Sequence, residues 1–240
     1  MYKKNNYRQK TLEGRFQMKR ITSSELKKQY ILKNGLESVS SIDMFEISEL
    51  HEFEKNEFLI RSEVPSKYLY FLVSGEVIVT YSSFDKTVCV NYHKPLSWLG
   101  EASSLWQQQP NCNVQALGTC LCIAVDLALY REDLINDLTF LQNVSQILSY
   151  RLNHSTYQSS DLLEPTEIRL AKFILSHSSQ NIFPLQLTNC ALILNTSYRH
   201  LLRIMKDFCE KGFLKKTKNI YQITDRCGLE ACISGNTAIS

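Results

Sequence analysis

The sequence predicts an α+β fold, in which an antiparallel β-roll or jelly-roll is followed by a long helix and then by a small unit of short helices and a β-hairpin. Three observations lead to this prediction. Short β-branched and aromatic runs separated by turn residues extend from His51 to about Ile123. After Asp126 the apolar residues recur every three to four positions, which is the period of a helix. Residues 196–226 contain eight basic and three acidic residues, although the net charge of the 240-residue chain is only +3.

Six segments are the expected strands of the β-roll. They are rich in β-branched and aromatic residues, and turn residues such as Ser74-Gly75 and Gly118-Thr119 stand between them. The expected strands cover residues 58–60, 68–73, 76–81, 88–92, 114–117 and 120–125.

Two helices are expected after the β-roll. A short one begins at Leu127, and a longer one runs from Thr139 to about His154, where the polar residues 153–160 suggest a hinge. The longer helix has an apolar stripe wide enough to pack on a partner helix, which predicts a homodimer. The expected dimer-helix residues are Phe140, Val144, Ile147, Leu148 and Arg151.

The predicted domain boundaries follow these changes of pattern. Residues 1–40 are polar and basic and are expected to form a disordered tail, within which Met18 is an alternative start to Met1. The β-roll domain is expected over residues 41–125, and the connecting and dimerisation helices over 126–160. The unit of short helices is expected over 161–240, with Pro165 at the start of its first helix.

Residues 187–224 hold the most specific pattern of the chain. Thr188–Leu194 predict a short helix, Asn195-Thr196 a turn, and Ser197 the N-cap of a second helix. After the second helix, two alternating segments around Lys218-Asn219 predict a basic β-wing. The inward face of the second helix is formed by residues spaced i, i+3, i+4 and i+7, namely Leu201, Ile204, Met205 and Phe208. The order of helix, turn, capped helix and hairpin predicts a winged helix-turn-helix.

The charges lie on the other face of the second helix and on the wing. Two arginines one turn apart fit a reader of the major groove, because Arg bonds bidentately to guanine while Lys and Tyr hold phosphates. The alternative is a structural module with a solvated cationic face, but the wing and the concentration of charge favour double-stranded DNA as a partner. The residues predicted to contact DNA are Ser197, Tyr198, Arg199, His200, Arg203, Lys206, Lys215, Lys216 and Lys218.

From about residue 45 onward the chain resembles the Crp/Fnr family of transcription regulators. Residues 196–205 are similar to the family's recognition-helix motif, a serine followed by Arg-Glu and by a further arginine one turn later. Tyr198 and Arg199 stand in place of the Arg-Glu pair, and Arg203 matches the later arginine, so the half-site preference of the best-known members does not transfer. Within the family the segment is most similar to the YeiL-like branch.

This resemblance implies a cyclic nucleotide-binding-like sensor domain and a homodimer. Two-fold symmetry then requires a pseudo-palindromic operator with half-sites about 34 Å apart. The resemblance also implies activation through contact with RNA polymerase, although repression is equally compatible with these residues. An effector in the β-roll would act by preferring one of two arrangements of the dimer.

A candidate effector pocket follows from the same resemblance. Gly100 and Glu101 match the Gly-Glu that opens the family's phosphate-binding cassette, which in nucleotide-binding members continues about ten residues later with an arginine and a small hydroxyl residue. This chain has Asn111 and Cys112 in that region, and it has no basic residue from Glu101 to Asp126. Burying a phosphate without a cationic partner is strongly disfavoured. Cyclic AMP is therefore not expected as an effector, and no other cofactor is required.

The cysteines of the β-roll suggest a second kind of signal. Cys120 and Cys122 lie on the same face of one expected strand. Fnr-type members of the family carry an iron–sulfur cluster on N-terminal cysteines, which this chain lacks, because its first 88 residues contain none. Free cysteines also pack as small hydrophobes, and this alternative is favoured. The candidates for a redox or cluster site are Cys89, Cys112, Cys120 and Cys122.

Two further classes of protein are alternatives to a transcription regulator. A cupin-like metal-dependent enzyme would need two or three converging histidines and a carboxylate, whereas this region has only His51 and His93. The common catalytic motifs are absent, so an enzyme is not expected. A ligand-sensing module that does not bind DNA is the other alternative. The chain has no apolar run of about 18 residues and no secretory signal, which predicts a cytoplasmic protein without a membrane partner.

Overall fold

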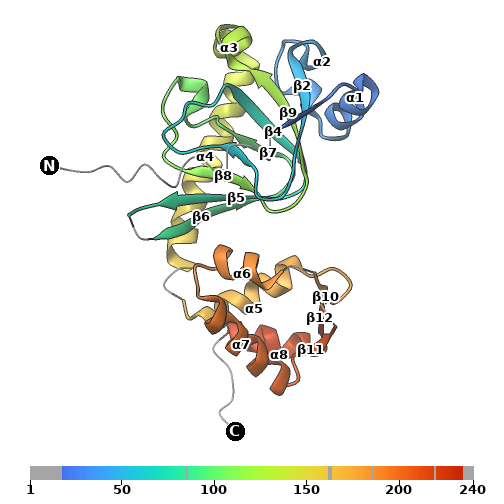
Figure 1. Ribbon diagram of the computed structural model, residues 1–240, viewed down its shortest axis with the longest axis vertical. Helices are drawn as coiled ribbons and strands as arrows, with labels where there is room; N and C mark the ends of the chain where they lie inside the picture. The colour runs from blue at the N-terminus through green and yellow to red at the C-terminus, as the bar shows by residue number, and fades with distance from the viewer. Residues whose placement is uncertain (1–17, 85, 162–163, 185, 219, 235–240) are drawn as a thin grey trace, which may run out of the picture. The chain divides into compact units, whose positions relative to one another are not determined.

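The structure, a computed structural model, describes residues 18–84, 86–161, 164–184, 186–218 and 220–234, with the backbone alone at 154–161. It divides into two compact units, the first ending at Leu148 and the second beginning at Ser149, and Figure 1 labels the elements of each. This division lies within helix α4 (Leu138–Asp161), not near residues 160–165. The polar stretch expected to be a hinge belongs to the same helix.

The first unit contains the two antiparallel sheets of the β-roll (Figure 1). The larger sheet has the strand order β1-β2-β9-β4-β7, and the smaller sheet has the order β3-β8-β5-β6. The six predicted strands are confirmed to within one residue at each end, and β1, β2 and β7 are additional to them. The strands are β1 (Lys19–Ile21), β2 (Ser48–Phe53), β3 (Phe58–Ile60), β4 (Tyr68–Ser74), β5 (Val77–Ser82), β6 (Thr87–His93), β7 (Ser97–Leu99), β8 (Asn113–Ala116) and β9 (Cys120–Asp126).

The central strands of the larger sheet are apolar on both faces. In β4, Leu69 and Phe71 point to one cluster of buried side chains, and Tyr70 and Leu72 point to another. Successive residues of a strand face opposite sides, so the sheet has a packed layer on each side. The second cluster fills the space between the two sheets, since β3, β5 and β8 also contribute to it.

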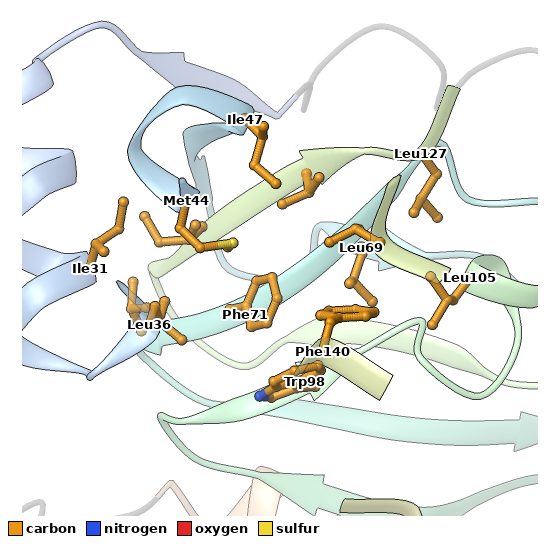
Figure 2. Packing of buried hydrophobic residues seen from close by; sticks show 14 of the residues in the cluster. Ile31, Leu36, Met44, Ile47, Leu69, Phe71, Trp98, Leu105, Leu127 and Phe140 are labelled. Carbon is orange, nitrogen blue, oxygen red and sulfur yellow. The ribbon is translucent and has the colours of Figure 1, made fainter. Parts of the chain in front are cut away.

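The first cluster is closed by helices from both ends of the unit (Figure 2). The helical elements before the roll include Ile31 and Leu36, which are buried in the same layer as Phe71. The prediction of a disordered tail over residues 1–40 is therefore wrong for residues 18–40, and residues 1–17 lie outside the described part of the chain. The helical elements are α1 (Ser24–Lys33), η1 (Leu36–Ser38), α2 (Met44–Ile47), η2 (Ser104–Trp106), α3 (Leu127–Asn136) and α4 (Leu138–Asp161).

Helix α4 packs on the β-roll through part of the stripe that was predicted to form the dimer. Phe140 and Val144 are buried in the first cluster, and the Phe140 ring stacks on Trp98 with the ring centroids 5.4 Å apart. Ile147 and Leu148 are half-buried against the same cluster. Phe140 and Val144 are therefore occupied by their own subunit, which corrects their assignment to the dimer face, whereas Ile147 and Leu148 stay partly exposed.

The second unit is a cluster of short helices with a small sheet. Its three strands lie in the order β10-β12-β11, and all pairs are antiparallel. The predicted short helix, capped helix and wing are confirmed, whereas β10 and α8 are additional to the prediction. The elements are α5 (Thr166–His177), β10 (Ile182–Phe183), α6 (Leu187–Ile193), α7 (Tyr198–Glu210), β11 (Leu214–Thr217), β12 (Ile220–Ile223) and α8 (Arg226–Ile233). Among the described residues, every helix falls short of the length and apolarity that crossing a membrane requires.

Candidate nucleic-acid interface

Helix α7 begins at a hydrogen-bonded cap. The Ser197 backbone is extended, and its Oγ accepts a hydrogen bond from the backbone N–H of His200 at 3.1 Å. This bond satisfies one of the N–H groups that the first turn of a helix leaves without an intrahelical partner. Asn195, two residues earlier, has a positive φ of 49°, which Asn tolerates better than most residues. The predicted turn and N-cap are confirmed, and they fix the first turn of α7.

The two faces of α7 have opposite environments, as the sequence predicts. The four inward residues are buried in the core of the second unit and meet residues of the neighbouring helices and wing. On the other face, Leu202 is exposed in addition to the predicted polar residues. The exposed side chains of the predicted set on α7 and its cap are Ser197, Tyr198, Arg199, Arg203 and Lys206, and His200 is half-buried.

Two arginines on the exposed face have no carboxylate to neutralise them. Lys206 forms an ion pair with Glu210, with an N–O distance of 3.3 Å. No comparable ion pair joins Arg199 or Arg203 to any residue that the structure describes. Their guanidinium groups are therefore available to an external anion with several acceptors.

Arg203 does have a partner within the helix. Its Nη2 donates a hydrogen bond to Nδ1 of His200 at 3.1 Å. The two residues are three positions apart, which places them next to each other on a helix surface. For the imidazole to accept this bond, its Nδ1 must carry a lone pair and not a proton.

An arginine of α5 supports the turn that precedes α7. Arg169 donates from Nη1 to the backbone carbonyl of Leu194 at 2.7 Å and from Nη2 to Oγ1 of Thr166 at 3.2 Å. The Leu194 carbonyl stands at the C-terminal end of α6, where helix carbonyls lack intrahelical partners. Sequence reasoning missed Arg169, because nothing in a regular helical pattern indicates which arginine turns inward.

The wing presents the three predicted lysines to solvent. Strands β11 and β12 are paired from Leu214 with Ile223 to Thr217 with Ile220. Lys218 lies in the connecting turn with a positive φ of 52°. The exposed wing lysines are Lys215, Lys216 and Lys218. Two cationic elements, the exposed face of α7 and the wing, therefore belong to one compact unit.

The predicted effector residues border strand β3. Gly100 has a positive φ of 98° and lies against the Ile60 side chain. The Asn111 carbonyl accepts a hydrogen bond from Oγ of Ser62 at 3.4 Å. Glu101 is buried, with 2% of its surface exposed. Asn111 is exposed and Cys112 is half-buried.

The four candidate cysteines lie in environments that favour the neutral thiol. Burial raises the pKa of Cys89 to about 11, and it raises the pKa of Cys122 well above the usual value. Cys120 is also buried, and its Sγ donates to the carbonyl of Glu76 at 3.2 Å. Burial raises the pKa of Cys112 as well. Within the described ranges, no three His, Cys, Asp or Glu side chains come together in a way that could hold a metal ion.

Helix α4 exposes a second side that differs from the predicted stripe. Leu138 is 69% exposed, and it lines a shallow open groove together with Leu141, Gln142, Ser145 and Gln146. Leu138, Leu141 and Ser145 are spaced i, i+3 and i+7, which places them along one side of the helix. Arg151, the fifth predicted dimer residue, is half-buried.

Comparisons with known proteins agree with both parts of this structure. Residues 50–134 match the family model of the cyclic nucleotide-binding domain. The regulatory protein YeiL of Escherichia coli O157:H7 is 28% identical over 181 residues, which cover 74% of this chain and 82% of YeiL.

Solved structures share the fold at low sequence identity. A CRP-family transcriptional regulator from Thermus thermophilus is 14% identical, with a TM-score of 0.65 over 76% of this chain and 96% of its own. FixK2 from Bradyrhizobium japonicum is 15% identical, with a TM-score of 0.65 over 77% of this chain and 96% of its own. A Crp/Fnr-family regulator from Eubacterium rectale is 13% identical, with a TM-score of 0.67 over 87% of this chain and 94% of its own.

Proposed function

We propose that the chain is a Crp/Fnr-family transcription regulator that binds DNA sequence-specifically as a homodimer, since residues 50–134 match the cyclic nucleotide-binding domain and the regulatory protein YeiL is 28% identical to it. The observation that carries this proposal is the pair of arginines on the exposed face of α7. Arg199 and Arg203 lie one turn apart, and no described carboxylate neutralises either one. A guanidinium group bonds O6 and N7 of guanine together, so two such groups on one helix can read base edges in the major groove.

The remaining cations have a different role in this proposal. Lys215, Lys216 and Lys218 on the wing neutralise phosphates, which orients α7 without carrying sequence information. Tyr198 and Lys206 contact the backbone beside the groove. Lys206 contributes less than the wing lysines, because Glu210 already offsets part of its charge.

The exposed stripe of α4 is the proposed dimer seam. It contains Leu138, Leu141 and Ser145, which are spaced i, i+3 and i+7, and Leu138 is 69% exposed. A seam with this spacing fits the pairing of two helices around a two-fold axis. The two copies of α7 would then read half-sites about 34 Å apart, one turn of B-DNA. Contact with RNA polymerase is the proposed output.

The β-roll is the proposed input domain, and its signal is not a cyclic nucleotide. Glu101 is buried, and the chain from Glu101 to Tyr130 contains no Lys, Arg or His. A nucleotide phosphate placed beside this segment would lack the cation that its burial requires.

The test is an in vitro selection of DNA by the purified full-length protein, followed by binding measurements on the enriched duplex and on a random duplex. Arg199→Ala and Arg203→Ala are each expected to weaken binding to the selected duplex by about 1–3 kcal/mol and to relax its base preference. Lys215→Ala and Lys216→Ala are expected to weaken both duplexes alike and to lower the salt dependence of binding.

A charge-matched control separates base reading from net charge. Lys28 is exposed on α1, so Lys28→Ala removes the same charge from the unit that carries neither α7 nor the wing. Lys28→Ala is expected to change the affinity for neither the selected duplex nor the random duplex. If no sequence were enriched, or if both arginine variants weakened the two duplexes equally, the proposed function would be wrong.

A further inference from the structure

We infer that His200 is a positioning residue, which orients Arg203 so that its guanidinium group meets a guanine. This inference rests on the proposed function and goes beyond it, because it assigns His200 no contact with DNA of its own. The observation behind it is the hydrogen bond from Nη2 of Arg203 to Nδ1 of His200, 3.1 Å long.

This bond is the second of two hydrogen bonds that link residues at the start of α7. The Ser197 hydroxyl accepts from the backbone N–H of His200 at 3.1 Å, and the His200 ring accepts from Arg203. The three residues are spaced by three positions and therefore follow one side of the first two turns. The cap fixes the backbone of His200, and the half-buried ring of His200 fixes the end of the arginine.

The bond leaves Arg203 able to read a base. A guanidinium group has five N–H donors, and His200 uses one of them. Nη2 keeps a second hydrogen, so the fork formed by Nη1 and Nη2 stays free for O6 and N7 of guanine. No carboxylate among the described residues competes for this fork.

The expected gain is the ordering of a long, flexible side chain before DNA arrives. Immobilising such a side chain on binding lowers affinity by roughly 2- to 10-fold. Loss of the His200 acceptor should therefore reduce the ratio of specific to random DNA affinity by about this factor. Affinity for random DNA and its salt dependence should not change, since His200 adds no phosphate contact.

Two substitutions with opposite effects on the helix test this inference. His200→Asn keeps an acceptor, because Asn Oδ1 stands as many bonds from Cβ as His Nδ1 does, although Asn is the poorer helix former. His200→Ala removes the acceptor and favours the helix. On the duplex selected in vitro, we expect the His200→Asn variant to retain the natural protein's ratio of specific to random DNA affinity. We expect the His200→Ala variant to lose it. Equal loss in both variants, or no loss in Ala, would overturn the inference.

A modified base identifies the atom that is read. 7-Deazaguanine lacks the N7 acceptor, so its substitution at each guanine of the selected duplex should weaken the natural protein at the guanines that Arg199 and Arg203 read in each half-site. Arg203→Ala should be unaffected at the Arg203 position. His200→Ala should show a smaller effect at that same position, and His200→Asn the full effect. If His200→Ala kept the full effect, the inference alone would fall and the proposed function would stand. If the natural protein enriched no sequence, the proposed function would fall first.

Discussion

His51 is a buried histidine of the β-roll with one side of its ring unsatisfied. Its side chain is fully buried, and its Nε2 lies 2.9 Å from a carboxylate oxygen of Glu49. Nδ1 has no hydrogen-bond partner among the described residues. Burial lowers the pKa of His51 below its usual 6.5, and the nearby charges of Arg20 and Lys67 act in the same direction, against the effect of Glu49. The folded chain therefore holds this ring in its neutral form.

The β-roll is expected to lose stability on acidification. The unfolded chain takes up a proton at His51 near pH 6.5, whereas the folded chain does so only at lower pH. Through this residue, the free energy of unfolding is thus constant well above pH 6.5 and falls as the pH drops below it. His51→Gln, which does not titrate and keeps a donor for Glu49, should lose less stability on acidification.

The measurement is urea unfolding followed by tryptophan fluorescence on either side of this pH. The chain has 2 tryptophans, and both Trp98 and Trp106 lie in the first unit, so the signal reports the β-roll. Equal losses of stability in the natural protein and in His51→Gln would contradict the expected role of this residue.

At the scale of residues, the sequence predicted the role of a side chain where that role depends on residues nearby in the chain. It did not predict roles that depend on residues brought close by folding. Ser197 could be predicted as a cap because Ser before a helical period has a local meaning. Arg169 could not be predicted, since its partner carbonyl at Leu194 is brought to it only by folding. The sequence is compatible with two roles for the four cysteines of the β-roll, as small packing residues or as ligands. Only their burial in the structure distinguishes these two roles.

At the scale of elements, periodicity predicted the helices and strands that have a regular apolar pattern. It missed those that form through contacts with elements distant in the sequence. Helix α7 has one buried face, so its spacing alone defined it. In α1, Ile31 is the only buried residue, and its short apolar pattern is hidden by lysines and glutamine. β10 has two residues and is ordered by pairing with β12, which no local pattern reveals.

The error on α4 has a simple physical origin. The helix has apolar residues on two sides, and the sequence does not say which side its own β-roll will cover. The aromatic side, with Phe140, packs on Trp98 inside the subunit. The other side, with Leu138 and Ser145, lines the open groove that is the proposed seam.

Substitutions on the two sides of α4 should therefore have different effects. Leu138→Glu combined with Ser145→Glu places like charges on the proposed seam, and both sites are exposed in the subunit. We expect this double variant to be monomeric by light scattering, with the tryptophan-reported unfolding energy changed by no more than about 0.5 kcal/mol. Phe140→Ala should instead destabilise the β-roll by about 3–5 kcal/mol.

The outcome for the double variant decides where the seam lies. A dimer of natural stability would show that these residues are not at the interface. The Phe140→Ala variant serves as the contrasting control, because its side chain is fully buried in the first unit. Retained β-roll stability in that variant would contradict the packing of α4 described above.

At the scale of the whole molecule, charge is distributed according to the proposed roles of the units. Residues 21–160 contain ten basic and sixteen acidic residues, whereas residues 161–240 contain ten basic and seven acidic residues. An anionic duplex is thus attracted to the unit that carries α7 and the wing.

Cyclic AMP is expected not to bind, although residues 50–134 match the family model of the cyclic nucleotide-binding domain. Arg131 is the first cation after Glu101, and two of its nitrogens are already engaged: Nε donates to the Leu105 carbonyl at 2.7 Å, and Nη1 pairs with Glu132. A ligand at 100 times its dissociation constant would add about 2.7 kcal/mol to the unfolding energy. Millimolar cyclic AMP should leave the tryptophan-reported urea midpoint unchanged, because no free cation in this segment offsets the desolvation of its phosphate. A saturable rise in that midpoint would contradict this prediction.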